Sequence, residues 1–149
     1  MTYLIIGSDS ESIKEEITRL ISRLWNKKIN KEVLEIRSAD IHTITTENIN
    51  SIGIEDIKRL QKEMIFTPYS ESVQVALIFN ADKLTEEAQN SFLKTLEESN
   101  NNTAYILTTS NEKNLLPTII SRSLKVYTKD ISVQNNSEEI PNTLTKNLI

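Results

Sequence analysis

The sequence predicts an α/β domain of three layers, in which helices cover both faces of a mostly parallel, five-stranded sheet. Three observations predict this fold. Short β-favouring runs alternate with amphipathic helical segments along the chain. The run Val73–Phe79 is apolar at nearly every position, which is typical of a strand buried on both faces. The 149 residues suffice for one sizeable core, so a single domain is expected.

A strand and a helix are expected at the N-terminus. Tyr3–Ile6 is a short β-favouring run that stops at Gly7, and the helix after it carries apolar residues on one face as far as Leu24. Ser8 and Ser12 each precede a glutamate by three residues, so either could form a capping box at the start of this helix.

The next stretch is expected to hold two strands and one helix. Val33–Ile36 favours a strand, and a shorter pairing is expected near His42–Ile44. The sole histidine, His42, has no neighbouring nucleophile pattern, so we interpret it as a loop residue. Apolar residues between Ile54 and Ile65 recur at helical spacing, and this helix has to end before Pro68.

Strands and helices alternate more clearly in the second half of the chain. Val73–Phe79 is expected at the centre of the sheet, and Thr85 can cap a helix that runs through Glu98. The remaining elements are a turn at Asn100–Asn102, a strand at Thr103–Thr109, a short helix from Pro117 to about Arg122 and a last strand at Leu124–Tyr127.

Composition and charge limit the classes of function. The net charge is −4, so the surface lacks the basic footprint of a free-standing nucleic-acid-binding protein. No apolar run approaches the roughly 18 residues of a membrane span, so we expect a cytoplasmic protein without membrane contact. The chain has no cysteine, which excludes disulfides and thiolate zinc sites. We expect a core domain over residues 1–128 and a mobile polar tail over residues 129–149.

Four segments in the second half carry the most specific pattern. They are Ser51–Leu60, Ala81–Thr85, Ala88–Glu98 and Leu115–Arg122. Their order and spacing resemble those of the clamp-loader AAA+ family, in particular the delta-prime subunits of bacterial DNA polymerase III. Core packing alone does not require Asn90 within the third segment. The resemblance covers about residues 50–127 and implies a P-loop-NTPase-like (AAA+) fold.

The resemblance also implies a nucleotide site, and the first of its two motifs is altered. A phosphate loop has the pattern G-x-x-x-x-G-K-[ST], in which backbone N–H groups and the lysine hold phosphate oxygens. Gly7 matches the first glycine. Ser12, Ile13 and Lys14 stand where the second glycine, the lysine and the magnesium-binding hydroxyl belong. We therefore predict that the phosphate loop is degenerate.

The second motif of the family is altered as well. It ends a strand in Asp-Glu, which hold the metal and position water, but this chain has Phe79 and Asn80 there. Asp9 and Glu11 add negative charge where a triphosphate would have to arrive. We expect no ATP hydrolysis by the chain itself, and no bound cofactor or metal ion.

One family residue with a catalytic role is retained. The family's Ser-Arg-Cys motif presents its arginine to ATP held by the neighbouring subunit, and Ser121, Arg122 and Ser123 stand at that motif here. The resemblance therefore implies that Arg122 is an arginine finger acting in trans. The sequence by itself leaves open that Arg122 only interacts with the C-terminus of its own helix. Thr108 and Thr109, at the family's nucleotide-sensing position, are expected to be structural.

The resemblance implies partners and leaves two other functions open. The implied partners are ATP-hydrolysing clamp-loader subunits of the gamma/tau type and, through the complex, the sliding clamp and primed DNA. The chain carries no four-cysteine zinc module, and by the resemblance we expect the family's helical lid and collar domain to be missing as well. One alternative is a stand-alone scaffold or regulatory domain. The other is an NTP-binding enzyme with an altered loop, in which Lys14 and Asp82 would act together.

Overall fold

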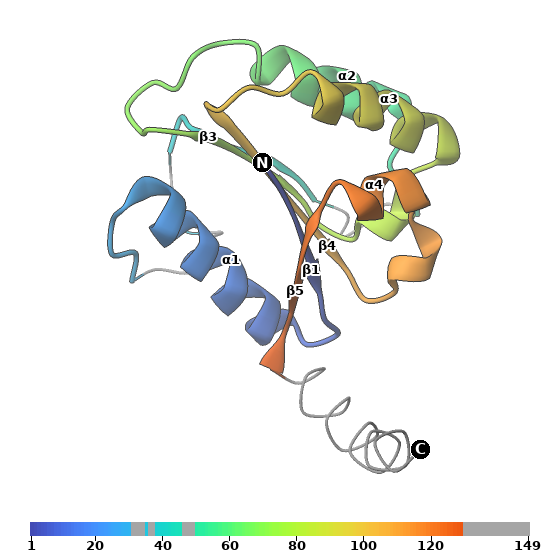
Figure 1. The fold of residues 1–149 in the computed structure, drawn as a ribbon, viewed down its shortest axis with the longest axis horizontal. Helices are drawn as coiled ribbons and strands as arrows, with labels where there is room; N and C mark the ends of the chain where they lie inside the picture. Colours follow the sequence, from blue (N-terminus) through green and yellow to red (C-terminus); the bar gives the residue numbers. More distant parts are fainter. Residues whose placement is uncertain (31–34, 36–37, 46–49, 130–149) are drawn as a thin grey trace, which may run out of the picture.

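The computed structural model describes residues 1–30, 35, 38–45 and 50–129, which form the predicted three-layer α/β domain (Figure 1). Five strands form one sheet in the order β2-β3-β4-β1-β5, and every neighbouring pair is parallel. No helix within these ranges is long and apolar enough to cross a membrane. The elements are β1 (Thr2–Ile6), α1 (Ser10–Trp25), β2 (Ile41–Ile44), α2 (Ile54–Glu63), β3 (Gln74–Ile78), η2 (Ala81–Lys83), α3 (Glu86–Glu97), β4 (Thr103–Thr109), η3 (Glu112–Asn114), α4 (Pro117–Ser121) and β5 (Leu124–Tyr127).

The helices divide the core between the two faces of the sheet. In Figure 1, α1 lies against one face, whereas α2, α3 and α4 lie against the other. Under α1, Ile17 and Ile21 pack against Val75 and Ile106. On the other face, the fully buried Phe92 of α3 meets Tyr105 of β4 edge to face, with ring centroids 5.4 Å apart.

The centre of the sheet is β4 rather than β3. All seven residues of β4 and all five of β3 are buried, which confirms the two-sided burial predicted for Val73–Phe79. The prediction that this run is central was wrong, because β2 pairs with the outer edge of β3. Apolar content could not separate the two strands, since helices cover both faces over each of them.

The region before α2 corrects one further prediction, whereas another falls on residues that the structure does not describe. The strand predicted at Val33–Ile36 lies outside the described residues apart from Glu35. The shorter pairing is observed as β2, and His42 lies within this strand instead of in a loop. Its Nδ1 atom is 3.3 Å from the Oε2 atom of Glu63, at the end of α2.

α2 ends earlier than its apolar spacing predicts. The helix stops at Glu63, and Met64 forms its C-cap. Ile65, predicted on the inner face, lies beyond the helix, and its side chain is 75% exposed. Further along the chain, the backbone of residues 69–71 binds the carboxylate of Asp40.

Asp40 holds the connection between α2 and β3. Its side chain is inaccessible to solvent and accepts hydrogen bonds from the backbone N–H groups of Tyr69 at 2.5 Å, Ser70 at 2.8 Å and Glu71 at 2.8 Å. Burial by itself raises the pKa of this carboxyl, but the hydrogen bonds from Ser70, Tyr69 and Glu71 outweigh burial and lower the pKa below its usual 3.8. The ionised form of Asp40 therefore stabilises the fold.

We expect Asp40→Asn to lower the free energy of unfolding at pH 7 by roughly 1.5–3 kcal/mol, because the backbone donors lose a charged acceptor. The folded pKa of Asp40 is depressed, so its stabilisation is complete above the unfolded pKa. The stabilisation is lost as pH falls through the folded pKa. The measurement is the free energy of unfolding of the wild type and Asp40→Asn in urea, at a series of pH values between 7 and 2.

The control for this prediction is Glu55→Gln on α2, whose side chain is 85% exposed and should stay within about 0.5 kcal/mol of the wild type. A difference between wild type and Asp40→Asn that stays constant as pH falls would contradict the charged-acceptor explanation.

Candidate functional site

The N-terminus of α1 is capped by a carboxylate of the chain itself. Asp9 is the N-cap, and its Oδ2 atom accepts hydrogen bonds from the backbone N–H of Ser12 at 3.1 Å and from the Ser12 hydroxyl at 2.7 Å. The capping boxes predicted at Ser8 and Ser12 were wrong, because a charged carboxylate is a stronger acceptor and interacts with the helix dipole. Asp9 thus provides the negative charge that a phosphate would provide at a helix N-terminus.

Gly7 lies under the end of the last strand. The backbone N–H of Thr128 donates to the carbonyl of Ile6 at 3.0 Å, which places the Thr128 side chain over the loop after β1. A Cβ atom at Gly7 would lie 2.4 Å from Thr128 Oγ1 and 2.5 Å from Thr128 Cγ2. Close packing therefore requires a glycine here, independently of any ligand.

The residues at the predicted phosphate-loop positions contact the chain itself. Ser12 is bound by Asp9, and Ile13 is partly buried against the core under α1. Lys14 lies with its Nζ atom 3.8 Å from Glu11 Oε1, and its side chain is only 22% exposed. Most of the Lys14 side chain is therefore shielded from solvent.

Two threonines organise the segment that follows β3. Phe79 is partly buried against the core under α1, and Asn80 is exposed with a left-handed backbone at φ 55°. The backbone N–H of Asn80 donates to Thr108 Oγ1 at 3.0 Å, and the Thr109 hydroxyl donates to Asp82 Oδ1 at 2.9 Å. Thr108 and Thr109 thus have the structural contacts expected of them.

Lys14 and Asp82, proposed to act together in one alternative, belong to segments on opposite faces of the sheet. Lys14 is in α1, whereas Asp82 is in η2, whose Ala81 packs in the core beneath α2 and α3. Each has a polar neighbour of its own, Glu11 for Lys14 and Thr109 for Asp82. These contacts do not favour a shared catalytic role.

α4 is fixed to α3 by a buried amide. The Gln89 side chain accepts a hydrogen bond from the backbone N–H of Leu116, the N-cap of α4, at 2.8 Å. Its Nε2 atom lies within donating distance of the carbonyls of Leu84 at 3.2 Å and Asn114 at 3.4 Å. The Gln89 side chain thereby links the segment before α3 and the segment after β4 to the start of α4.

Gln89 was not predicted as a site residue, whereas its neighbour Asn90 was singled out. Asn90 is exposed, whereas Gln89 is only 5% exposed. A signal was present, because Gln89 precedes Phe92 by three residues and Leu96 by seven, which places it on the inner face of α3. A polar residue on an inner face needs buried partners.

Arg122 lies at the C-terminal end of α4 as its C-cap, at the surface of the domain. Its Nη2 atom is 3.3 Å from Glu97 Oε1 at the end of α3, and the two side chains are 48% and 46% exposed. The hydroxyls of Ser121 and Ser123 donate to the carbonyls of Thr118 and Ile119 at 3.0 Å and 2.7 Å. These bonds stabilise the last turn of α4 and fix the backbone on either side of Arg122.

The register of β5 separates Arg122 from Gly7. Leu124 is level with Tyr3 and Tyr127 is level with Ile6, so Arg122 precedes the first paired residue whereas Gly7 follows the last. The paired stretch alone spans about 10 Å at ~3.3 Å per residue, and Arg122 and Gly7 lie beyond its two ends. Arg122 therefore lies at the opposite edge of the sheet from the loop that begins at Gly7.

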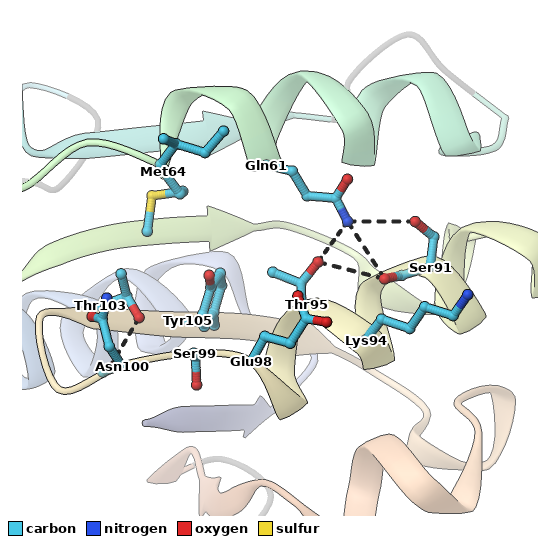
Figure 2. Close-up of a pocket in the computed structure, with 11 residues that line it drawn as sticks. Gln61, Met64, Ser91, Lys94, Thr95, Glu98, Ser99, Asn100, Thr103 and Tyr105 are labelled. Atoms are coloured by element: carbon cyan, nitrogen blue, oxygen red, sulfur yellow. Dashed lines mark hydrogen bonds between the residues drawn. The ribbon is translucent and has the colours of Figure 1, made fainter.

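A groove between α2 and α3 contains none of the predicted site residues. It encloses about 530 Å³ and is crossed by Gln61, whose Nε2 atom donates to Thr95 Oγ1 at 2.6 Å (Figure 2). Burial raises the pKa of the Tyr105 hydroxyl on the groove wall, and a hydrogen bond with Thr103 offsets part of that rise. The polar contacts in the groove join the two helices.

Comparison with known proteins identifies relatives of this domain. The family described as "DNA polymerase III, delta subunit" matches residues 1–132. DNA polymerase III subunit delta' of Bacillus subtilis is 39% identical over 83 residues, which are 56% of this chain and 25% of that protein. DNA polymerase III subunit tau of Escherichia coli is 26% identical over 116 residues, covering 78% of this chain and 18% of that protein. The chain spans about a quarter or less of the length of these curated relatives.

A solved structure supports the same relationship. A DNA polymerase III gamma subunit-related protein from Thermotoga maritima superimposes with a TM-score of 0.73 at 25% sequence identity. The match covers 95% of this chain and 48% of that protein. The sheet and its helices therefore form the same fold as in this gamma subunit-related protein.

We expect Gly7→Ala to destabilise the domain by about 1–3 kcal/mol, because the added methyl group overlaps the side chain of Thr128. Thr128→Ala removes the two nearest atoms, so the double variant should lose less stability than the sum of the two single variants. Urea unfolding of the four proteins measures the coupling. Strictly additive losses would show that Gly7 is required for a reason other than this contact.

Proposed function

The chain belongs to the DNA polymerase III delta subunit family, and on that premise we propose that it is a non-catalytic clamp-loader subunit that offers Arg122 to a neighbouring ATPase. The single observation that carries the proposal is the placement of Arg122. It lies half-exposed at one edge of the sheet, while the loop that would hold a nucleotide begins at Gly7 on the other edge. An arginine so placed can serve the nucleotide of an adjacent subunit and not one bound by its own chain.

The proposed lack of catalysis rests on the state of both nucleotide motifs. Asp9 supplies a carboxylate at the helix N-terminus where a triphosphate would bind, and two anions at one helix end repel each other. Thr128 packs onto Gly7 from above. After β3, Asn80 replaces the carboxylates that would hold magnesium. We propose that both motifs are degenerate and that the chain binds no nucleotide.

The proposed partners follow from the family and from the charge of the chain. The relatives named as delta' and tau subunits support the proposal that Arg122 contacts the nucleotide of a neighbouring gamma/tau-type ATPase. The net charge of −4 does not favour direct binding of DNA by the chain alone. We propose that the chain contacts primed DNA and the sliding clamp only through the assembled complex. We place this activity in the cytoplasm. We also propose that residues 1–128 act as the core domain and residues 129–149 as a separate tail.

A second candidate is a stand-alone scaffold with the same fold. The observation that favours it is the ion pair of Arg122 with Glu97, because the side chain already has a partner within its own chain. Association with a gamma/tau-type subunit separates the two candidates. A scaffold without a clamp-loading role would not bind that subunit.

We expect no saturable binding of MgATP by the isolated chain up to millimolar concentration, measured by titration calorimetry, because Asp9 repels the phosphates. A gamma/tau-type subunit of the same organism provides the positive control. Binding by the wild type that disappears in Lys14→Ala would instead support an enzyme with an altered phosphate loop.

We expect Arg122→Ala to bind a gamma/tau-type subunit as the wild type does and to stimulate its ATPase rate at least about tenfold less. The reason is that an arginine supplied in trans contributes roughly 10³–10⁵ to such rates. The measurement is the steady-state ATPase rate of the partner, titrated with each variant, together with the dissociation constant of the complex.

The matched control is Arg19→Ala. Arg19 of α1 is 52% exposed and pairs with Glu16, so it resembles Arg122 in exposure and pairing but lies on another surface. Equal stimulation by wild type and Arg122→Ala would exclude the trans role of Arg122. Failure of the two proteins to associate would favour the scaffold.

A further inference from the structure

Arg122 is held in the free chain by one carboxylate, and this contact gives a role to a residue with no assigned function. We propose that Glu97 is a positioning residue that restrains Arg122 against α3 until a nucleotide-bearing neighbour draws the guanidinium away. The inference rests on the trans role proposed above for Arg122. Glu97 is then the residue that determines how readily the Arg122 guanidinium leaves α3 and reaches a neighbour's nucleotide.

The geometry of the pair indicates a weak restraint. A guanidinium and a carboxylate that bond strongly do so at about 2.7–2.9 Å, often through two parallel hydrogen bonds. Here one nitrogen, Nη2, lies 3.3 Å from one oxygen, Oε1. Both side chains are about half-exposed, so water and salt weaken the attraction. Exposed pairs of this kind shift an equilibrium by roughly fivefold at most.

The position of Glu97 indicates that removing its charge should favour, and not oppose, the interaction of Arg122 with a triphosphate. Glu97 is the last residue of α3 and Arg122 is the C-cap of α4, so each lies at a helix C-terminus, where the dipole is negative. Arg122 therefore remains favourably placed if the carboxylate is removed. An approaching triphosphate, in contrast, meets the negative charge of Glu97 beside the arginine. Neutralising Glu97 frees the guanidinium and removes this repulsion.

The start of α4 is fixed independently of the ion pair. Gln89 binds the backbone N–H of Leu116, and the Ile119 side chain is fully buried. The serine hydroxyls fix the last turn. Loss of the Glu97 carboxylate should thus change the freedom of the Arg122 side chain and leave the backbone that carries it in place.

The test is the partner's ATPase rate, titrated with wild type, Glu97→Gln, Glu98→Gln and Arg122→Ala at low and high salt. Glu97→Gln should lower the half-saturating concentration by about two- to fivefold at low salt, with the saturating rate unchanged. The difference should shrink at high salt, because screening weakens an exposed ion pair. A merely structural role would not depend on salt in this way.

Glu98→Gln is the matched control, because Glu98 is the exposed neighbour of Glu97 and has the same charge. Its half-saturating concentration should stay at the wild-type value. A change equal to that of Glu97→Gln would overturn the inference, since general repulsion would then explain both. Urea midpoints of both variants should match the wild type, because neither side chain is buried.

The NMR signal of the Arg122 guanidinium in the free chain tests the restraint without any partner. Glu97→Gln should shift this signal and speed the exchange of its protons, whereas Glu98→Gln should not. An unchanged signal overturns the inference while the role of Arg122 can still hold. If Arg122→Ala keeps full stimulation, the proposed function fails, and positioning by Glu97 fails with it.

Discussion

The burial of a parallel sheet on both faces is the constraint on which the rest of this domain depends. Strands β3 and β4 are buried at every position, so helices must cover both sides, and each connection between parallel strands must cross a face of the sheet. All strands run the same way. The segments that follow them therefore gather at one edge, and those that precede them gather at the other.

At the carboxyl edge, the chain satisfies its own exposed groups. The donors at the start of α1 bind Asp9, the space above Gly7 is filled by Thr128, and the turn after β3 is held by Thr108. Each of these contacts is made by residues of the chain itself. A ligand arriving at this edge would have to displace side chains that already bond there.

At the amino edge of the sheet, hydrogen bonds and an ion pair hold segments that core packing alone holds less firmly. Asp40 anchors the segment before β3 through three backbone N–H groups. Glu97 contacts Arg122 at the end of α4, whereas Gln89 holds the start of α4 toward the carboxyl edge. The hydrogen-bonding side chains of Asp40 and Gln89 are buried, whereas the weaker ion pair of Glu97 with Arg122 is exposed. Rigidity of the backbone and freedom of one arginine side chain thus coexist in the same short helix.

The sequence by itself determined the fold class and most helices and strands, because apolar spacing and turn residues report local structure directly. The family followed from the resemblance of four segments between Ser51 and Arg122. It also pointed to Arg122 and to the altered residues at positions 12–14, 79 and 80. Only the tertiary structure decided that β4 is central, that Asp9 is the cap, and that Gln89 and Asp40 are buried anchors. The cap is a local contact of Asp9 with Ser12, for which the capping patterns at Ser8 and Ser12 competed. The strand order and the partners of Gln89 and Asp40 depend on contacts between residues far apart in the chain, such as Asp40 with Ser70, which no local pattern encodes.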